Sequence, residues 1–149
     1  MSLAVKVNIK PKNFKDIPKK MRKSVQAQVK RALSKTAEVG IITILERTEK
    51  GMGFEGGKFG EYSKKGSNDG YFGVRSRSGK GVLPNLDFTG QMLGAIRAKA
   101  NNKRAVISFT RNVEQNKIKG NNRTRPFFGF SRAENKELGK KFTRFLDER

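Results

Sequence analysis

Two short stretches of the chain have residue types and spacings that occur in catalytic or nucleotide-binding sites. Glu134 and Lys136 form an acid-x-lysine triplet, which metal-dependent nucleases place on a strand beside a second acidic residue. The spacing from Ser131 to Glu134 instead predicts a capping box at the start of a helix, where the carboxylate has a structural role. Because no partner carboxylate is evident in the sequence, we expect no nuclease activity.

The second stretch, residues 51–56, reads Gly-Met-Gly-Phe-Glu-Gly and matches the G-x-G-x-x-G dinucleotide fingerprint. In a dinucleotide site these glycines follow a strand and open a helix, so that helix amides meet the pyrophosphate. Here the preceding residues predict a helix and the following residues predict a loop. We therefore expect no nucleotide cofactor.

The chain contains no histidine and no cysteine. Histidine is the usual acid–base residue near neutral pH and the commonest zinc ligand. Without either residue type, Ser-His-Asp triads, Cys-His nucleophiles, zinc fingers and disulfides are excluded. We expect a protein that is not an enzyme and that uses no metal or cofactor.

The charge of the chain is strongly positive, with 34 basic and 13 acidic residues and a formal net charge of +21. A field of this sign attracts DNA, RNA and acidic protein surfaces. Basic residues near Tyr62, Tyr71 and Phe72 could follow a phosphate backbone while the aromatic rings stack on bases. These candidate DNA-channel contacts are Lys64, Lys65, Arg75, Arg77 and Lys80. Solvated charge that only maintains solubility is the alternative, and the sequence leaves both open.

The elements that would position these residues fit one domain, residues 1–149, because the length suits a single core. Alternating apolar residues from Leu3 to Ile9 predict a strand with one buried face. A cap at Asp16 and apolar residues at every fourth position as far as Leu45 predict one long helix, which Gly40 could bend. No window has the apolar length of a membrane span, so we expect no membrane association.

Residues 51–82 are rich in glycine and contain regularly placed aromatic residues. This composition predicts a long arm without a regular element of its own, which becomes ordered against a partner. The aromatic residues are too frequent for a plain flexible linker.

The C-terminal part of the chain predicts four further segments. Residues 86–96 indicate a short helix capped by Asp87 or Thr89, and residues 96–100 and 105–109 indicate a hairpin. Residues 111–124 indicate a polar loop. The capping box at Ser131 opens a closing helix with an apolar stripe at Leu138, Phe142, Phe145 and Leu146. The predicted fold class is α+β, a small antiparallel sheet packed against a long N-terminal helix, with a C-terminal helix and a glycine-rich arm.

Three motifs follow one another along this part of the chain. In residues 57–63 a glycine-containing approach leads to an aromatic residue and a Tyr-Ser pair. Residues 86–96 carry a leucine, then Thr-Gly, then a leucine, small residues and an isoleucine. Residues 125–131 make an Arg-Pro-aromatic step into the closing helix. In this order and spacing they resemble the phage virion-morphogenesis proteins, the tail-completion or head–tail joining group.

The resemblance implies a structural virion protein of a tailed bacteriophage, made in the host cytoplasm and located in the neck or upper tail. It implies a homo-oligomeric ring, expected to be sixfold, which contacts other neck, tail-tube or connector proteins and makes non-specific contact with genomic DNA in its channel. A sequence-independent nucleic-acid-binding protein of ribosomal type is the alternative, because the charge alone would suit it.

The candidate interface residues are aromatic side chains and one arginine of these segments. They are Phe54, Phe59, Tyr62, Tyr71, Phe72, Arg125, Phe127 and Phe128. Pro126 holds the chain extended, so that Phe127, Phe128 and Phe130 form an apolar patch. Such a patch either fills the chain's own core or contacts an adjacent subunit.

Overall fold

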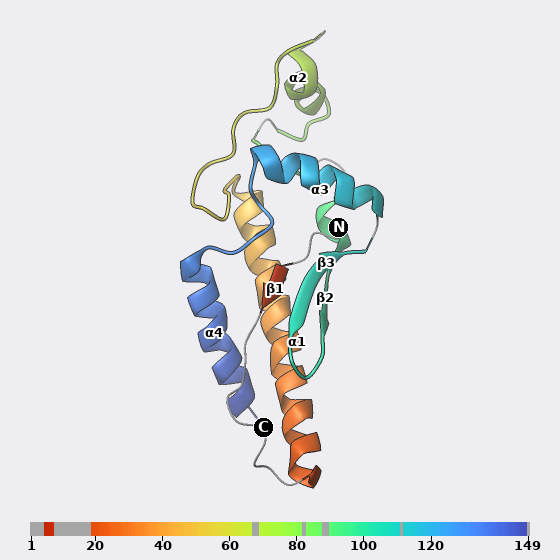
Figure 1. Ribbon diagram of the computed structural model, residues 1–149. Coiled ribbons are helices and arrows are strands. Elements are labelled where there is room, and N and C mark those ends of the chain that lie inside the picture. The colour runs from red at the N-terminus through yellow and green to blue at the C-terminus, as the bar shows by residue number, and fades with distance from the viewer. Residues whose placement is uncertain are drawn as a thin grey trace.

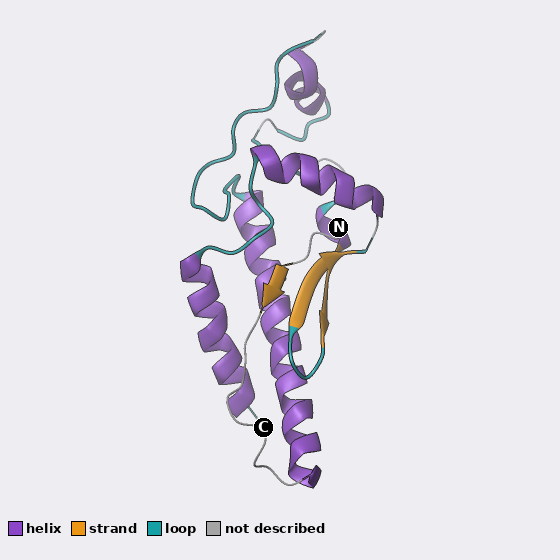
Figure 2. Ribbon diagram, viewed as in Figure 1, coloured by secondary structure: helices purple, strands orange, loops and turns teal. Residues whose placement is uncertain are grey.

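The computed structural model describes residues 5–7, 19–66, 69–81, 83–87, 90–110 and 112–148. The elements in chain order are β1 (Val5–Val7), α1 (Lys19–Glu49), α2 (Gly70–Arg77), the 3-10 helix η2 (Leu93–Ala95), β2 (Ile96–Ala100), β3 (Ala105–Phe109), α3 (Asn112–Thr124) and α4 (Arg132–Asp147). Figures 1 and 2 show α1 as the long axis, with α4 beside it, the hairpin of β2 and β3 on another side, and α3 and α2 beyond its C-terminal end. The fold class is α+β, as predicted.

The long helix α1 forms the centre of the core and contacts α4, β2 and β3. Its buried side chains recur at three- and four-residue intervals, which is the spacing of one helix face. They are Val29, Ala32, Leu33, Thr36, Ala37, Ile44 and Thr48. The hydroxyls of Thr36 and Thr48 donate to the carbonyls of Ala32 and Ile44, so burial leaves neither group unpaired. The long helix that the apolar spacing predicts is confirmed.

Gly40 lies within α1 at a point of very close packing. A Cβ atom at this position would lie 2.9 Å from Cζ of Phe130 and 3.0 Å from Cδ1 of Ile107. The helix continues through this residue to Glu49. Because glycine has no side chain, Ile107 of β3 and the Phe130 ring can pack directly against the backbone of α1 at this position.

The sheet is antiparallel and has the strand order β1-β3-β2. The central strand β3 buries Ala105, Ile107 and Phe109 on alternate positions, which is the period of a strand with one core face. Ile107 pairs with Val5 on one side and with Ala98 on the other. The predicted hairpin is confirmed, and β1 confirms the described part of the predicted N-terminal strand.

The closing helix α4 begins at the predicted capping box. The Ser131 hydroxyl accepts from the Glu134 amide at 3.1 Å, and the Glu134 carboxylate accepts from the Ser131 amide at 2.8 Å. Leu138 and Phe142 are buried, so the predicted stripe faces α1. At the far end, Lys35 of α1 donates to the Glu148 carboxylate at 2.8 Å, and this bond lowers the pKa of Glu148.

The prediction of a polar loop at residues 111–124 is wrong, because Asn112–Thr124 is the helix α3. Only one of its described side chains, Ile118, is fully buried. Its packing at the end of the sheet, beside β3, stabilises a segment whose apolar pattern is too sparse to indicate a helix.

The prediction of a short helix over residues 86–96 is wrong for most of that range, because among its described residues only Leu93–Ala95 is helical, as a single 3-10 turn. Leu86 and Gly90 have φ values of 57° and 73°, which interrupt a right-handed helix. The Asp87 carboxylate accepts from the Gly90 amide at 2.7 Å, so Asp87 closes a turn instead of capping a helix. Phe88 and Thr89 lie outside the described residues.

The glycine-rich segment is not without a regular element, because it contains α2. After the last turn of α2, the Ser78 amide donates to the Val74 carbonyl and the Lys80 amide donates to the Arg75 carbonyl. Phe59 and Tyr62, earlier in the segment, are buried within the same chain. The described residues of this segment therefore pack within the single chain, although the sequence predicts that the segment becomes ordered against a partner.

The close packing at Gly40 gives a stability prediction. Gly40→Val should lower the free energy of unfolding by about 2 kcal/mol, because added methyl groups would collide with Phe130 and the buried Ile107. Gly139→Val in α4 is the matched control, since nothing lies within 4 Å of a Cβ atom there. Urea unfolding of both variants measures the difference. Equal stability of the two variants would contradict the packing role of Gly40.

Candidate functional site

The three motifs meet around the side chain of Tyr62. Arg125 of the third motif donates from Nε to the Gly60 carbonyl at 3.0 Å and from Nη2 to the Glu61 carbonyl at 2.8 Å. Its guanidinium carbon lies 4.9 Å from the Tyr62 ring centroid. The Leu86 amide of the second motif donates to the Tyr62 hydroxyl at 3.1 Å. Segments far apart in the sequence are thus joined at one buried aromatic ring.

A second arginine, Arg75 of α2, contacts the same ring, with its guanidinium carbon 5.0 Å from the Tyr62 centroid. Its Nε and Nη atoms donate to the carbonyls of Gly81, Asp87 and Lys80 and to Oδ1 of Asn85, at 2.7 to 3.0 Å. The residue is only 1% exposed. The guanidinium is therefore used to close the loop after α2.

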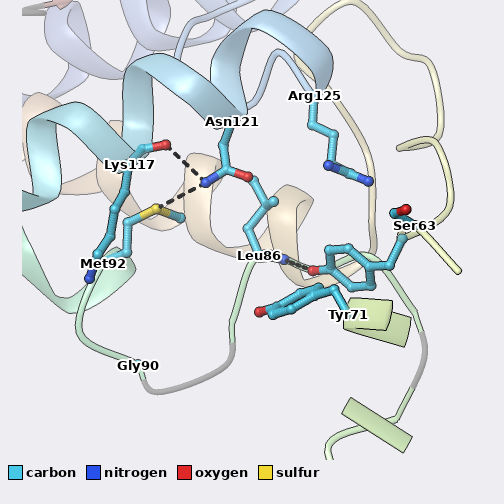
Figure 3. A pocket seen from close by; sticks show the side chains of 9 residues that line it. Ser63, Tyr71, Leu86, Gly90, Met92, Lys117, Asn121 and Arg125 are labelled. Carbon is cyan, nitrogen blue, oxygen red and sulfur yellow. Dashed lines mark hydrogen bonds between the residues drawn. The ribbon is translucent and has the colours of Figure 1, made fainter. Parts of the chain in front are cut away.

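A pocket of about 510 Å³ lies beside this junction, between α3 and the segment that carries Tyr62 and Tyr71 (Figure 3). Its lining residues are Tyr62, Ser63, Tyr71, Leu86, Gly90, Met92, Lys117, Asn121 and Arg125. Two of these residues are cationic and none carries a carboxylate. Such a cavity, with apolar walls and a few polar groups directed into it, is suited to binding a small ligand or a peptide side chain.

The predicted interface aromatics divide into buried and accessible groups. Phe59, Tyr62, Phe127 and Phe128 are buried, and the Phe128 ring lies 4.6 Å from that of Phe109. Within the single chain, the apolar patch after Pro126 therefore fills the chain's own core. Buried rings of this kind support the segments that carry a contact surface, but they are not part of that surface.

The other predicted interface residues remain partly or largely accessible. Tyr71 is 42% exposed and meets Tyr62 edge to face at 4.9 Å between ring centroids. Phe72 is half-buried with Lys64 4.6 Å above its ring. Phe54 is half-buried and packs against Gly129, where a Cβ atom would lie 2.8 Å from the ring. Arg125 is half-buried at the pocket.

Four of the five predicted DNA contacts are exposed, namely Lys64, Lys65, Arg77 and Lys80. These four lie around α2 and can reach a polyanion. Arg75 is the exception, because the carbonyl and amide oxygens that surround it occupy its donors. As a phosphate contact, the prediction for Arg75 does not fit its burial.

The two motifs with possible chemistry have structural roles. Gly51, with a φ of 69°, ends α1, and the glycine run enters turns instead of opening a helix, as the sequence analysis expects. Glu134 forms an ion pair with Arg47 in addition to capping α4. Arg47 also donates to the carbonyls of Phe127 and Gly129 at 2.6 and 3.0 Å. The Glu134 carboxylate is therefore used to join α1 to the start of α4.

Met92, Lys117 and Asn121 line the pocket but are not predicted from the sequence to be site residues. Lys117 and Asn121 are four residues apart on α3 and share one face, but that spacing has meaning only if the segment is helical. The run of Glu, Gln and Lys between residues 114 and 119 has good helix propensity and is the one signal that could indicate it.

The environment of Arg75 leads to a prediction about the arm. Arg75→Lys should speed proteolysis within residues 70–81 and lower stability by about 2 kcal/mol, because one ammonium cannot replace four donor contacts in a planar fork. Arg77→Lys, at an exposed position of the same helix, is the control with the same charge. Limited proteolysis with chymotrypsin, which can cleave after Tyr71 and Phe72, together with thermal unfolding measures both effects. If the two variants behave alike, Arg75 does not hold the arm.

Comparison of this chain with known protein families, with curated proteins and with solved structures finds no match. Among the residues that the structure describes, no group of three or more acidic side chains is arranged to hold a metal ion. In the same part of the chain, no helix combines the length and apolar character needed to cross a bilayer.

Proposed function

We propose that this chain is a non-enzymatic structural protein of a tailed bacteriophage, which assembles with copies of itself into a ring in the neck or upper tail. The observation that carries the proposal is the meeting of the three family-like motifs at Tyr62. Residues of these motifs are joined across sequence separations of 24, 64 and 65 residues. Each motif is short, but their direct contact gives a physical reason for their occurring together.

The junction acts as a support for a surface. It holds α2 and its neighbouring loops beyond the end of the main body, as Figure 1 shows, by contacts of Arg75 and Arg125 to backbone carbonyls. A projecting segment with a defined conformation suits a protein whose task is contact with neighbours. The Glu134 carboxylate pairs with Arg47 and caps α4, so its role is structural. This supports a function without catalysis.

The exposed apolar side chains offer a surface for assembly. Tyr71 and Val74 are each 42% exposed and lie three residues apart on α2, so they share one helix face. Leu83, in the loop that follows, is 55% exposed. Burying this surface between subunits would favour association, and it replaces the buried Phe59, Phe127 and Phe128 as the expected contact.

The alternative, a nucleic-acid-binding protein of ribosomal type, has one observation in its favour. From Lys19 to Ala37, α1 carries seven basic residues and no acidic residue. Lys23, Lys30 and Arg31 of this part are exposed, so the positive charge is accessible. In the ring, the same charge would lower the cost of holding DNA in a channel.

Ring formation and salt dependence distinguish the two functions. The neck protein should form closed rings, alone or with virion partners, in negative-stain electron microscopy, and should bind DNA weakly at physiological salt. The alternative predicts a monomer whose affinity for DNA or RNA falls linearly on a plot of log affinity against log salt. A monomer with tight, strongly salt-dependent binding would end the ring proposal, as would normal head–tail joining after deletion of the gene.

The α2 surface gives a mutational test of the same proposal. Val74→Glu should abolish or strongly weaken rings, because a carboxylate would be buried in an apolar contact, while thermal stability changes little at an exposed position. Ser76→Glu, also exposed on α2, adds the same charge as a control. Light scattering after size-exclusion chromatography measures both variants. Intact rings with Val74→Glu would exclude this surface as the subunit contact.

A further inference from the structure

The pocket beside Tyr62 contains a cation with unused hydrogen-bonding capacity. In Arg125, Nε donates a hydrogen bond to the Gly60 carbonyl and Nη2 donates one to the Glu61 carbonyl. Within the described part of the chain, Nη1 has no acceptor and no carboxylate pairs with the guanidinium. Figure 3 shows this group directed into the space between Asn121 and Ser63. A guanidinium held in this way is preorganised for an anionic ligand.

Two further residues that line the cavity, Tyr62 and Asn121, offer one hydrogen-bond donor and one acceptor. The Tyr62 hydroxyl accepts from the Leu86 amide, so its own proton is left to donate. Nδ2 of Asn121 donates to the Lys117 carbonyl at 2.9 Å and contacts the Met92 sulfur at 3.7 Å, which fixes the orientation of the amide. Oδ1 of Asn121 is therefore available to accept from a ligand N–H.

The combination of a cation, a hydroxyl donor and an amide acceptor matches a peptide carboxylate with a neighbouring N–H. The lining contains no carboxylate that would repel such a ligand, and Leu86 and Met92 provide apolar walls for its methylene groups. The phosphates of a DNA duplex lie on a broad rod and would not enter a recessed cavity of this kind as readily. The chemistry therefore favours an acidic peptide over nucleic acid.

We propose that this pocket binds the carboxylate of an acidic side chain in a peptide segment of a partner protein. Arg125 pairs with the carboxylate, the Tyr62 hydroxyl donates to it, and Oδ1 of Asn121 accepts from the peptide backbone. Lys117 adds positive charge at the same wall. The proposal goes beyond the virion role and does not depend on it, because the pocket forms within the single chain.

The test uses the full chain and two pentapeptides, acetylated and amidated, with the sequences Gly-Leu-Glu-Leu-Gly and Gly-Leu-Gln-Leu-Gly. Titration at physiological salt is followed by the backbone amide signals of Leu86 and Arg125 in ¹H–¹⁵N NMR spectra. The glutamate peptide should shift these signals and reach saturation at millimolar concentration. The glutamine peptide should bind about tenfold or more weakly, because it cannot form the charge-assisted bonds.

Two neighbouring asparagines of α3 provide matched variants. Asn121→Asp places a carboxylate on the pocket wall and should weaken binding of the glutamate peptide by about tenfold or more. Asn122→Asp adds the same charge outside the lining and keeps the oxygen that accepts from the Phe128 amide at 2.9 Å. It should bind within about twofold of the unchanged protein, since the added charge lies outside the pocket lining.

Four results would overturn the proposal. The first is that the glutamate peptide shows no saturable binding, and the second is that the two peptides bind equally. The third is that Asn121→Asp and Asn122→Asp change binding equally. The fourth is that a short DNA duplex shifts the same signals more strongly than the peptide and loses this effect in Asn121→Asp. The last result would assign the pocket to phosphate. None of these results bears on ring formation, so failure here leaves the assembly proposal intact.

Discussion

The structure depends on how the guanidinium groups packed within it are hydrogen-bonded in a chain that has few acidic residues. With 34 basic and 13 acidic residues, one-to-one pairing must leave at least 21 cations without a carboxylate partner. Arg75 and Arg125 show the solution, because their guanidinium groups are bonded chiefly to oxygens of the backbone and lie against the Tyr62 ring. The planar fork of arginine allows this, whereas lysine has no comparable geometry.

The same principle joins the rest of the molecule. Arg47 connects α1 to the residues before α4 through two carbonyls and the Glu134 carboxylate, and it does so where that carboxylate already caps the helix. Backbone carbonyls of loops would otherwise require water or a strand partner. The arginines therefore satisfy loops that have no regular hydrogen bonding, which explains how a glycine-rich segment is ordered within one chain.

Periodic features were predictable from the sequence, and features that depend on tertiary contacts were not. The four-residue spacing in α1, the alternation in β3 and the Ser131–Glu134 box each act locally, and each is confirmed. The helix α3 and the left-handed φ of Leu86 depend on packing against distant segments. The burial of Arg75 was not predictable for the same reason, since only the folded loop brings its acceptors together.

Preorganisation changes the expected energetics of assembly. A disordered arm would lose conformational entropy when it contacts a partner, and buried aromatic surface would have to offset that loss. Phe59 and Tyr62 are already buried in the single chain, so this part of the ordering occurs during folding. Association then begins from a formed pocket and an exposed α2 face, so less entropy remains to be lost on contact. The glycine-rich composition consequently reflects turns with left-handed backbone, such as the one at Gly51 after α1 with a φ of 69°, more than a need for flexibility at the interface.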